Sequence, residues 1–195
     1  MDKRVIKTRQ AIQDAYFYLL FEKKSTRITV TELARVANID RKTFYLHYNE
    51  VEDVMAAFAK GIMNRFVEDL KNSGYYGNVL EIEKVFGVLN HMLEEDIDFY
   101  RKLAACPATE ILWNELQQAL EQSVVKELMT TQKGMVSSVL RLSRVQIYSE
   151  YLTAGIVKTY REWLRNDQGI SLDELAEIET EITRHGMNAV FQFVI

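Results

Sequence analysis

The chain has 195 residues, 48% of them hydrophobic, which is enough to bury a sizeable core and excludes wholesale disorder. A single proline and eight glycines favour helices, because strands and turns usually use more of both, so we expect an all-α protein. The lone Cys106 excludes an internal disulfide, and no run approaches the roughly 18 apolar residues of a membrane span. These features predict a cytoplasmic protein with no membrane partner.

The net charge of −4 hides an uneven distribution. Residues 1–50 carry ten Lys and Arg against six Asp and Glu, whereas residues 51–195 carry 14 against 22. A basic segment on an acidic body is typical of a nucleic-acid-binding head. Chance variation of surface charge is the alternative.

The first predicted helix runs from about Lys3 to Phe21. Apolar residues at helical spacing give it a face that can pack against the following helices. Its start is crowded with cations that either contact phosphates or belong to a solvated terminus: Lys3, Arg4, Lys7 and Arg9.

Residues 29–48 carry the most informative pattern, two short helices joined by a tight turn. Thr29 and Glu32 have the spacing of a capping box, and Asp40 can cap the second helix. Asn38 between them is one of the few residues other than glycine that tolerate a left-handed backbone. An apolar pair brackets each cap as a potential hydrophobic staple: Ile28 with Leu33, and Ile39 with Phe44. This combination predicts a helix-turn-helix, which lays its second helix into the major groove of DNA.

The remaining residues are expected to form a helical body. Ser171 and Glu174 predict another capping box at the start of the last helix, and the last two long helices should form an antiparallel pair. Pro107 marks a break or a new first turn. The expected helices cover residues 49–71, 79–105, 108–130, 136–142 and 143–165, and a final stretch that begins at Ser171.

The chain resembles the TetR/AcrR-type transcriptional regulators. The motifs that carry the resemblance are Leu33-Ala34-x-x-Ala37-Asn38-Ile39, Thr43-Phe44-Tyr45-x-His47-Tyr48 and Glu52-Asp53-Val54. Tyr151, Ala154-Gly155-Ile156-Val157 and Trp163-Leu164 resemble the branch with C-terminal domains like those of dihydroxyacetone-kinase regulators. The resemblance implies a three-helix DNA-binding head in residues 1–50. It also implies an effector-binding and dimerisation body in residues 51–195, with residues 51–73 as the connecting helix.

Two positions depart from the family pattern. Asn38 replaces the common glycine, which costs little because asparagine accepts that backbone conformation. Val51 replaces the usual lysine and removes one expected phosphate contact, which should lower the salt dependence of DNA binding by roughly one phosphate equivalent.

The second helix of the motif contains the best candidates for base contacts. Arg41 can form two bonds to guanine, and Thr43 can use its hydroxyl or its methyl group. Lys42 either joins them or only neutralises a phosphate. The backbone-contacting positions implied by the family are Tyr45, His47 and Tyr48, to which Thr29 and Thr31 add possible phosphate bonds. For Tyr48, inward packing beside Phe44 is the favoured alternative, and capping alone explains Thr29.

The family also implies a ligand pocket and a dimer interface in the body. The pocket candidates are aromatic or apolar residues that are equally explained as ordinary core: Phe58, Ile62, Phe66, Phe86, Phe99, Tyr100, Trp113 and Tyr148. The dimer candidates are Tyr151, Ala154, Gly155, Ile182 and Phe191. A glycine inside a long helix costs roughly 1 kcal/mol, which a close helix approach across a two-fold axis would explain.

No catalytic constellation, metal-ligand set or cofactor motif appears, and the three histidines are far apart in the sequence. The main hypothesis is a homodimeric repressor that binds a palindromic operator and is released by a small-molecule effector. The alternative is a regulator-like interaction protein that has lost DNA binding, and an enzyme is the weakest hypothesis.

Overall fold

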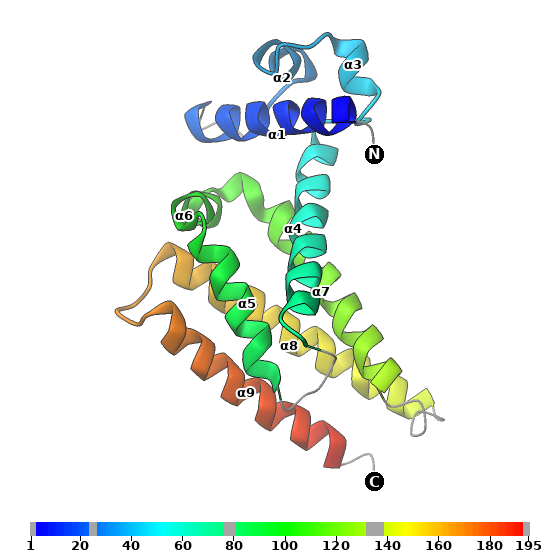
Figure 1. Cartoon of the computed structure of the whole chain (residues 1–195), viewed down its shortest axis with the longest axis vertical. Helices are drawn as coiled ribbons and strands as arrows, with labels where there is room; N and C mark the ends of the chain where they lie inside the picture. Colours follow the sequence, from blue (N-terminus) through cyan, green and yellow to red (C-terminus); the bar gives the residue numbers. More distant parts are fainter. Residues whose placement is uncertain (1–2, 24–26, 76–80, 132–138, 193–195) are drawn as a thin grey trace. The chain divides into compact units, whose positions relative to one another are not determined.

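The computed structural model describes residues 3–23, 27–75, 81–131 and 139–192, and within them every regular element is helical (Figure 1). This confirms the all-α prediction. The elements are α1 (Lys3–Lys23), α2 (Val30–Val36), α3 (Arg41–Tyr45), α4 (Glu52–Asn72), α5 (Ile82–Glu94), α6 (Ile97–Ala105), the 3-10 turn η2 (Pro107–Thr109), α7 (Glu110–Thr131), α8 (Val139–Arg165) and α9 (Leu172–Gln192).

The chain divides into two compact units. The first comprises Met1–Gly61 and Cys106–Glu115, and the second comprises Ile62–Ala105 and Leu116–Ile195. The boundary after Gly61 therefore falls inside α4, and α7 is shared in the same way.

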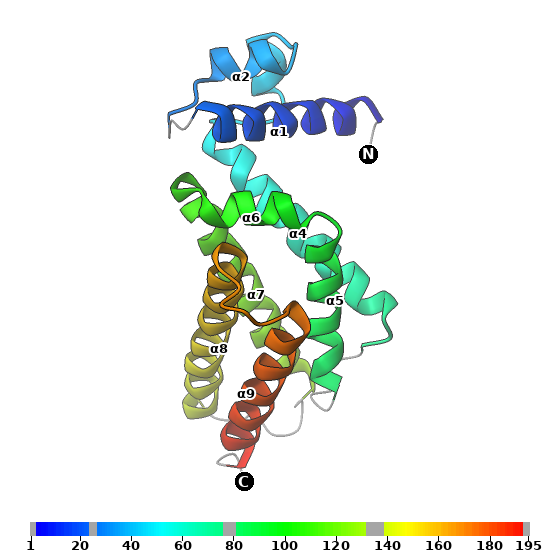
Figure 2. The ribbon, with the colours of Figure 1, turned by 90° about the vertical axis from the view of Figure 1, so that its left-hand side faces the viewer.

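The first unit is built around α1, on which α2 lies (Figure 2). Ile12, Leu33 and Phe44 are completely buried, so α1, α2 and α3 each supply a residue to one core. The Phe17 and Phe58 rings meet edge to face with their centroids 4.6 Å apart, and this contact anchors the first turns of α4 to α1. The two short helices of the helix-turn-helix, α2 and α3, are thus held in place by a shared hydrophobic core.

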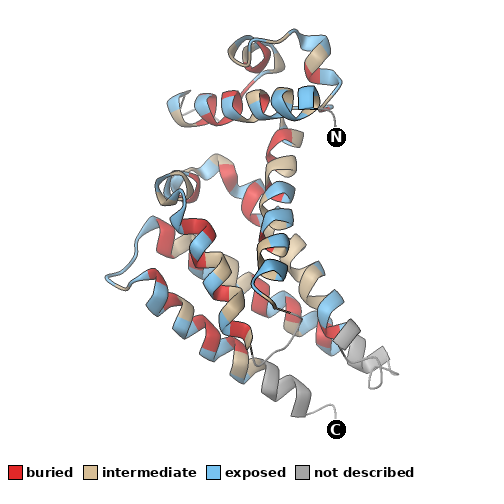
Figure 3. Cartoon of the chain, viewed as in Figure 1, coloured by how far each residue is buried: buried red, intermediate tan, exposed pale blue. Residues whose placement is uncertain are grey.

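The second unit is organised around the antiparallel pair α8 and α9, with α5 beside α9 (Figures 1 and 2). The Asn90 side chain on α5 joins both helices: its amide N–H donates to the Leu172 carbonyl oxygen at 2.9 Å, and its oxygen accepts the Tyr160 hydroxyl at 3.0 Å. The Phe86 ring stacks on Tyr160. Buried residues recur along the inward side of these helices (Figure 3). One amide therefore satisfies polar groups of two other elements inside an apolar core.

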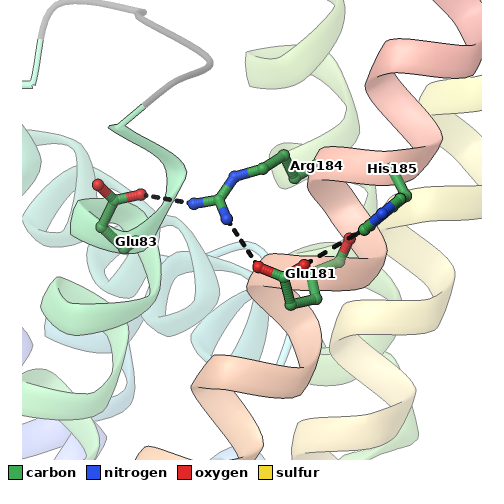
Figure 4. Close-up of polar contacts among 4 residues, drawn as sticks. All are labelled: Glu83, Glu181, Arg184 and His185. Carbon is green, nitrogen blue, oxygen red and sulfur yellow. Dashed lines mark hydrogen bonds and ion pairs between the residues drawn. The ribbon is translucent and has the colours of Figure 1, made fainter.

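Charged side chains reinforce the contact between α5 and α9 at the surface. The Arg184 guanidinium donates to Glu181 Oε1 at 2.7 Å and to Glu83 Oε2 at 3.2 Å (Figure 4). His185 Nδ1 lies 2.8 Å from the Glu181 carbonyl oxygen on the same helix (Figure 4). Because these groups are accessible to solvent, the pairs fix register more than they add stability.

Two predicted helices are corrected by the structure. The single helix over 79–105 is wrong, because α5 ends at Glu94 and α6 begins at Ile97. Asp96 starts the new helix by accepting the Phe99 N–H on its carbonyl oxygen at 3.1 Å, and its side chain lies 3.4 Å from the same N–H. The separate helix over 136–142 is also wrong in part, because residues 139–142 belong to α8; residues 136–138 lie outside the described ranges.

The two capping boxes are confirmed. In the last helix, the Glu174 N–H donates to Ser171 Oγ at 3.1 Å and the Ser171 N–H donates to Glu174 Oε2 at 2.7 Å. The bond from the Ser171 N–H lowers the pKa of the Glu174 carboxyl. Helix α4 begins at Glu52. The N–H groups of Asn49 and Glu50, which precede the helix, donate to Asp53 Oδ2 at 2.7 and 3.1 Å.

Glu179 on α9 is the basis for a prediction about pH. Its side chain is 4% exposed, and burial raises the pKa of its carboxyl, with a hydrogen bond from Thr159 acting in the opposite direction. A raised folded-state pKa means that stability falls as pH rises above the unfolded pKa of about 4.3. Glu179→Gln should therefore raise the urea unfolding midpoint at pH 8, and the gain should shrink toward pH 4.

The exposed Glu177 on the same helix provides the control for this measurement. Glu177→Gln removes the same formal charge without removing a buried carboxylate. It should leave the pH dependence of the midpoint as in the wild type. A Glu179→Gln gain that is equal at pH 4 and pH 8 would contradict the argument from burial.

Candidate nucleic-acid interface

The predicted capping box at α2 is confirmed. The Glu32 N–H donates to Thr29 Oγ1 at 3.3 Å, and the Thr29 N–H donates to Glu32 Oε2 at 3.2 Å. The two side chains thus satisfy two backbone groups that a helix end leaves without partners. Since the Thr29 hydroxyl also donates to Glu32 Oε2 at 3.0 Å, capping occupies this side chain fully.

The turn between α2 and α3 has the left-handed residue that the sequence predicts. Asn38 has a φ of 53°, and the Ile39 N–H then donates to the Ala34 carbonyl oxygen at 3.0 Å. This bond closes the end of α2 and sets the direction in which α3 leaves the turn.

A substitution at Asn38 tests the role of this conformation. Asn38→Ala should destabilise the chain by about 1 kcal/mol, because a Cβ-bearing residue without a polar side chain is strained in the left-handed region. Asn38→Gly, the matched control, should lie within about 0.5 kcal/mol of the wild type. Urea unfolding followed by circular dichroism measures both. Equal losses for the two variants would show that the Asn38 side chain, and not the backbone, matters.

Asp40 caps α3 as predicted. Its Oδ1 accepts the Thr43 N–H at 2.6 Å, and this bond lowers the pKa of the Asp40 carboxyl. The carboxylate therefore stays charged at neutral pH and holds the first turn of α3 in place, the turn that carries Arg41 and Lys42.

The outward face of α3 is cationic and aromatic. Arg41 and Lys42 are exposed, Thr43 is partly exposed, and Tyr45 is 50% exposed, whereas Phe44 on the opposite side is completely buried. A helix of five residues held at its base by one aromatic anchor can present these side chains outward without unfolding.

The other candidates for backbone contacts differ in exposure. Thr29 and Thr31 are exposed, and His47 is partly exposed. Tyr48 is only 5% exposed, with its ring 5.7 Å from that of Phe44, and burial raises the pKa of its hydroxyl. A buried phenol cannot reach a phosphate without moving, so Tyr48 fits the inward-packing alternative better than a DNA contact.

One exposed residue of this surface is absent from the sequence-based candidates. Leu46, the C-cap of α3, is 74% exposed, although it is a large aliphatic residue. It lies four positions after Lys42, and this helical spacing is the signal that places it on the same face.

The eight ligand-pocket candidates are divided between the two units. Phe58 and Trp113 belong to the first unit, where Trp113 Nε1 donates to Thr109 Oγ1 at 3.2 Å. In the second unit the Tyr148 hydroxyl donates to the Thr183 carbonyl oxygen at 3.2 Å, and Phe86 stacks on Tyr160. The other four candidates also belong to the second unit. Phe66 is buried, Ile62 is partly buried, and the rings of Phe99 and Tyr100 contact each other. Of these residues Phe66, Phe86 and Trp113 are buried and belong to the core, whereas Phe58, Phe99, Tyr100 and Tyr148 are partly buried.

A surface cleft of about 570 Å³ opens in the second unit, and none of those eight residues lines it. Arg101 lines the cleft, and its guanidinium lies 3.6 Å from Asp167 and 5.7 Å from the centre of the Trp163 ring. These contacts hold the turn between α8 and α9 on α6. Of its eight lining residues two are apolar, Ala105 and Leu164, and six are charged or polar: Asp98, Arg101, Lys102, Arg165, Asn166 and Asp167.

The predicted dimer residues include two very exposed apolar side chains, Tyr151 at 78% and Ile182 at 55%. Ala154 is partly exposed, and a Cβ added to the exposed Gly155 would meet nothing within 4 Å, so no contact with the described residues requires glycine there. The side chain of Phe191 lies outside the described part of the chain. Two further exposed residues sit four positions before Tyr151 and Ile182, namely Ile147 and Ile178.

We call Ile147, Tyr151, Ile178 and Ile182 the α8–α9 apolar set. Each helix contributes an i,i+4 pair of large apolar side chains to solvent. In a single chain such side chains gain nothing from exposure, and their concentration on two neighbouring helices is typical of a protein–protein interface.

Other kinds of site find no support in the described residues. Among them no group of three or more His, Cys, Asp or Glu side chains is placed to hold a metal ion. None of the described helices is long and apolar enough to cross a bilayer. His91 and Glu95, which have ligand-like spacing in the sequence, are 3.9 Å apart, and Glu95 is paired with Arg65.

An all-helical chain with a doubly capped helix-turn-helix and a cationic face on its second helix is a DNA-binding regulator by class. The sequence comparison makes the assignment specific: residues 81–185, more than half of the chain, match the TetR family model for the transcriptional regulator C-terminal region. The chain belongs to the TetR family of transcriptional regulators.

A curated relative supports the same family. The chain is 32% identical over 92 residues to an uncharacterised HTH-type transcriptional regulator of Bacillus subtilis (strain 168), YxbF. The match spans 46% of this chain and only 24% of that protein.

Solved structures show that the fold is shared. A putative TetR-family regulator from Syntrophomonas wolfei has a TM-score of 0.67 at 14% identity, with 91% of this chain and 93% of that one covered. Thermus thermophilus FadR, a repressor solved with lauroyl-CoA, has a TM-score of 0.61 at 19% identity, with coverage of 92% and 94%. The dihydroxyacetone kinase operon activator DhaS has a TM-score of 0.56 at 20% identity, with coverage of 90% and 93%.

Proposed function

We propose that the protein is a homodimeric repressor in the cytoplasm that binds a palindromic operator and is released by a small-molecule effector. The single observation that carries the proposal is the exposed cationic face of α3, with Arg41 and Lys42 outward and Phe44 buried beneath. In this proposal residues 1–50 are the DNA-binding domain, and residues 51–195 bind effector and form the dimer through the last two helices.

The roles of the DNA-binding residues follow from their exposure and chemistry. Arg41 and Thr43 contact base edges, Lys42 contacts a base or a phosphate, and Tyr45 and His47 hold the phosphate backbone. Thr31 adds a phosphate contact at the start of α2. A two-fold dimer places two copies of α3 in successive major grooves, about 34–36 Å apart, so the operator should be palindromic.

Release by an effector requires that the ligand bind the DNA-competent and DNA-incompetent states unequally. The complex of Thermus thermophilus FadR with lauroyl-CoA motivates the class of ligand, because its backbone fold is similar to this one. We therefore propose an effector with a long apolar part, held by apolar side chains of residues 62–195. The protein acts by binding, without catalysis.

The competing proposal is a co-regulator without DNA binding, and Val51 is the observation that favours it. This position is partly buried and uncharged, where the family usually places a phosphate-binding lysine. The remaining exposed cations of α3 weigh against it.

A gel shift at about 50 mM salt with duplex DNA from upstream of the protein's own gene tests the two proposals. The repressor proposal expects a discrete shift that an unrelated duplex does not compete away, and relief of the shift by an acyl-CoA or another effector. A failure to shift this or any selected duplex would leave the co-regulator proposal in its place.

A further inference from the structure

Leu46 is a large apolar side chain at the exposed end of α3. It is 74% exposed, the largest value for any bulky apolar residue described in the first unit. Leu33, inside the motif, and Ile28, just before it, are buried, and Ile39 is partly buried. Single exposed leucines are common on protein surfaces, so what distinguishes Leu46 is its position at the end of α3.

Its position on α3 connects it with the cations. The Leu46 N–H donates to the Lys42 carbonyl oxygen at 3.1 Å, so the helical geometry continues through Leu46 although the helix proper ends at Tyr45. Residues four apart lie on the same face, which pairs Lys42 with Leu46 and Arg41 with Tyr45. The outward face of α3 is therefore cationic in its first turn and apolar at its end.

This distribution of charged and apolar side chains is complementary to the chemical groups that the major groove of DNA exposes. The cations face phosphates and guanine edges, whereas Leu46 can neither donate nor accept a hydrogen bond. The apolar group that a base pair exposes in the major groove is the C5 methyl of thymine. A phosphate oxygen would leave the exposed leucine without a complementary partner.

We propose that Leu46 is a specificity-determining residue that reads a thymine methyl group in each half-site. The inference rests on the proposed DNA-binding function and adds to it a thymine contact made by Leu46, separate from any that the methyl group of Thr43 makes. A partner protein covering Leu46 is the competing explanation, and it predicts that Leu46→Ala leaves the sensitivity to uracil unchanged.

The test removes the methyl group alone. A binding site is first selected from a random duplex library with the full-length protein, and each thymine is then replaced by uracil, which keeps every hydrogen-bonding group. For the wild type, uracil at one thymine per half-site should weaken binding about fourfold per half-site, the effect of one lost methyl contact. For Leu46→Ala, the same replacement should change the affinity less than 1.5-fold.

Two controls keep the result interpretable. Ile6→Ala removes another exposed aliphatic side chain of the first unit, and it should retain the uracil sensitivity of the wild type. Because Leu46 is exposed, Leu46→Ala should melt at the wild-type temperature, so its loss of sensitivity cannot be ascribed to unfolding.

The outcomes separate the inference from the function on which it rests. Selection of no duplex at all contradicts the proposed function, and the inference falls with it. Tight, sequence-specific binding that no uracil replacement weakens overturns the inference alone. The inference is equally overturned if Leu46→Ala remains as sensitive to uracil as the wild type.

Discussion

Replacing Arg41 by alanine is expected to reduce sharply the discrimination between the operator and an unrelated duplex while leaving non-specific binding largely intact. A bidentate bond from arginine to guanine contributes about 1–3 kcal/mol of discrimination, which is roughly 5- to 150-fold in affinity per half-site. Both half-sites lose this bond in a dimer. Fluorescence anisotropy at one salt concentration, with the operator and a scrambled duplex, measures the two affinities.

Arg35→Ala is the matched control, because Arg35 is an exposed cation of the same unit that lies on α2 and not on the reading face. Its removal should weaken both duplexes by the same small factor. If Arg41→Ala also weakened both equally, Arg41 would be a phosphate contact, and the bases would have to be read by other residues.

The reader motif could be predicted from the sequence because its determinants are local. Each cap is a bond between groups three residues apart, as in Thr29 with Glu32 and Asp40 with Thr43. The left-handed turn depends on the intrinsic tolerance of one residue, Asn38. Such interactions need no knowledge of the rest of the fold, so composition and spacing suffice.

Features that depend on tertiary packing were harder to predict from the sequence. The apolar stripe through residues 79–105 continues across the break between α5 and α6, so periodicity predicted one helix. Asp96 was the available signal for the break, since aspartate is a preferred N-cap. The role of Phe58 likewise depended on the Phe17 ring 41 positions earlier, which no local pattern encodes.

The outward face of α3 also contains a feature that could not be predicted from the sequence, the exposure of Leu46. The family motif identifies Thr43, Tyr45 and His47 but leaves the position of Leu46 open. Whether that side chain is buried or exposed is decided by how α3 rotates when Phe44 packs into the core. Burial of Phe44 on one side turns Leu46 toward solvent.

The α8–α9 apolar set yields the second large expected effect. Tyr151→Glu combined with Ile182→Glu should convert the proposed dimer into a monomer at ten micromolar protein, with the dissociation constant raised at least a hundredfold. In an isologous interface every substitution occurs twice, and each buried carboxylate without a partner costs several kcal/mol. Sedimentation velocity measures the association state. Operator affinity should fall in parallel, because two linked heads bind far more tightly than one.

Ile111→Glu provides the control, because Ile111 is a comparably exposed apolar residue on α7 in the first unit. It introduces one carboxylate at an exposed position that does not belong to the α8–α9 apolar set, and it should leave both association and operator affinity unchanged. A wild type that sediments as a monomer at ten micromolar, or a doubly substituted variant that remains a dimer, would contradict the interface. The exposed Tyr151 would then need a different partner to cover it, because the described residues of the chain leave it 78% exposed.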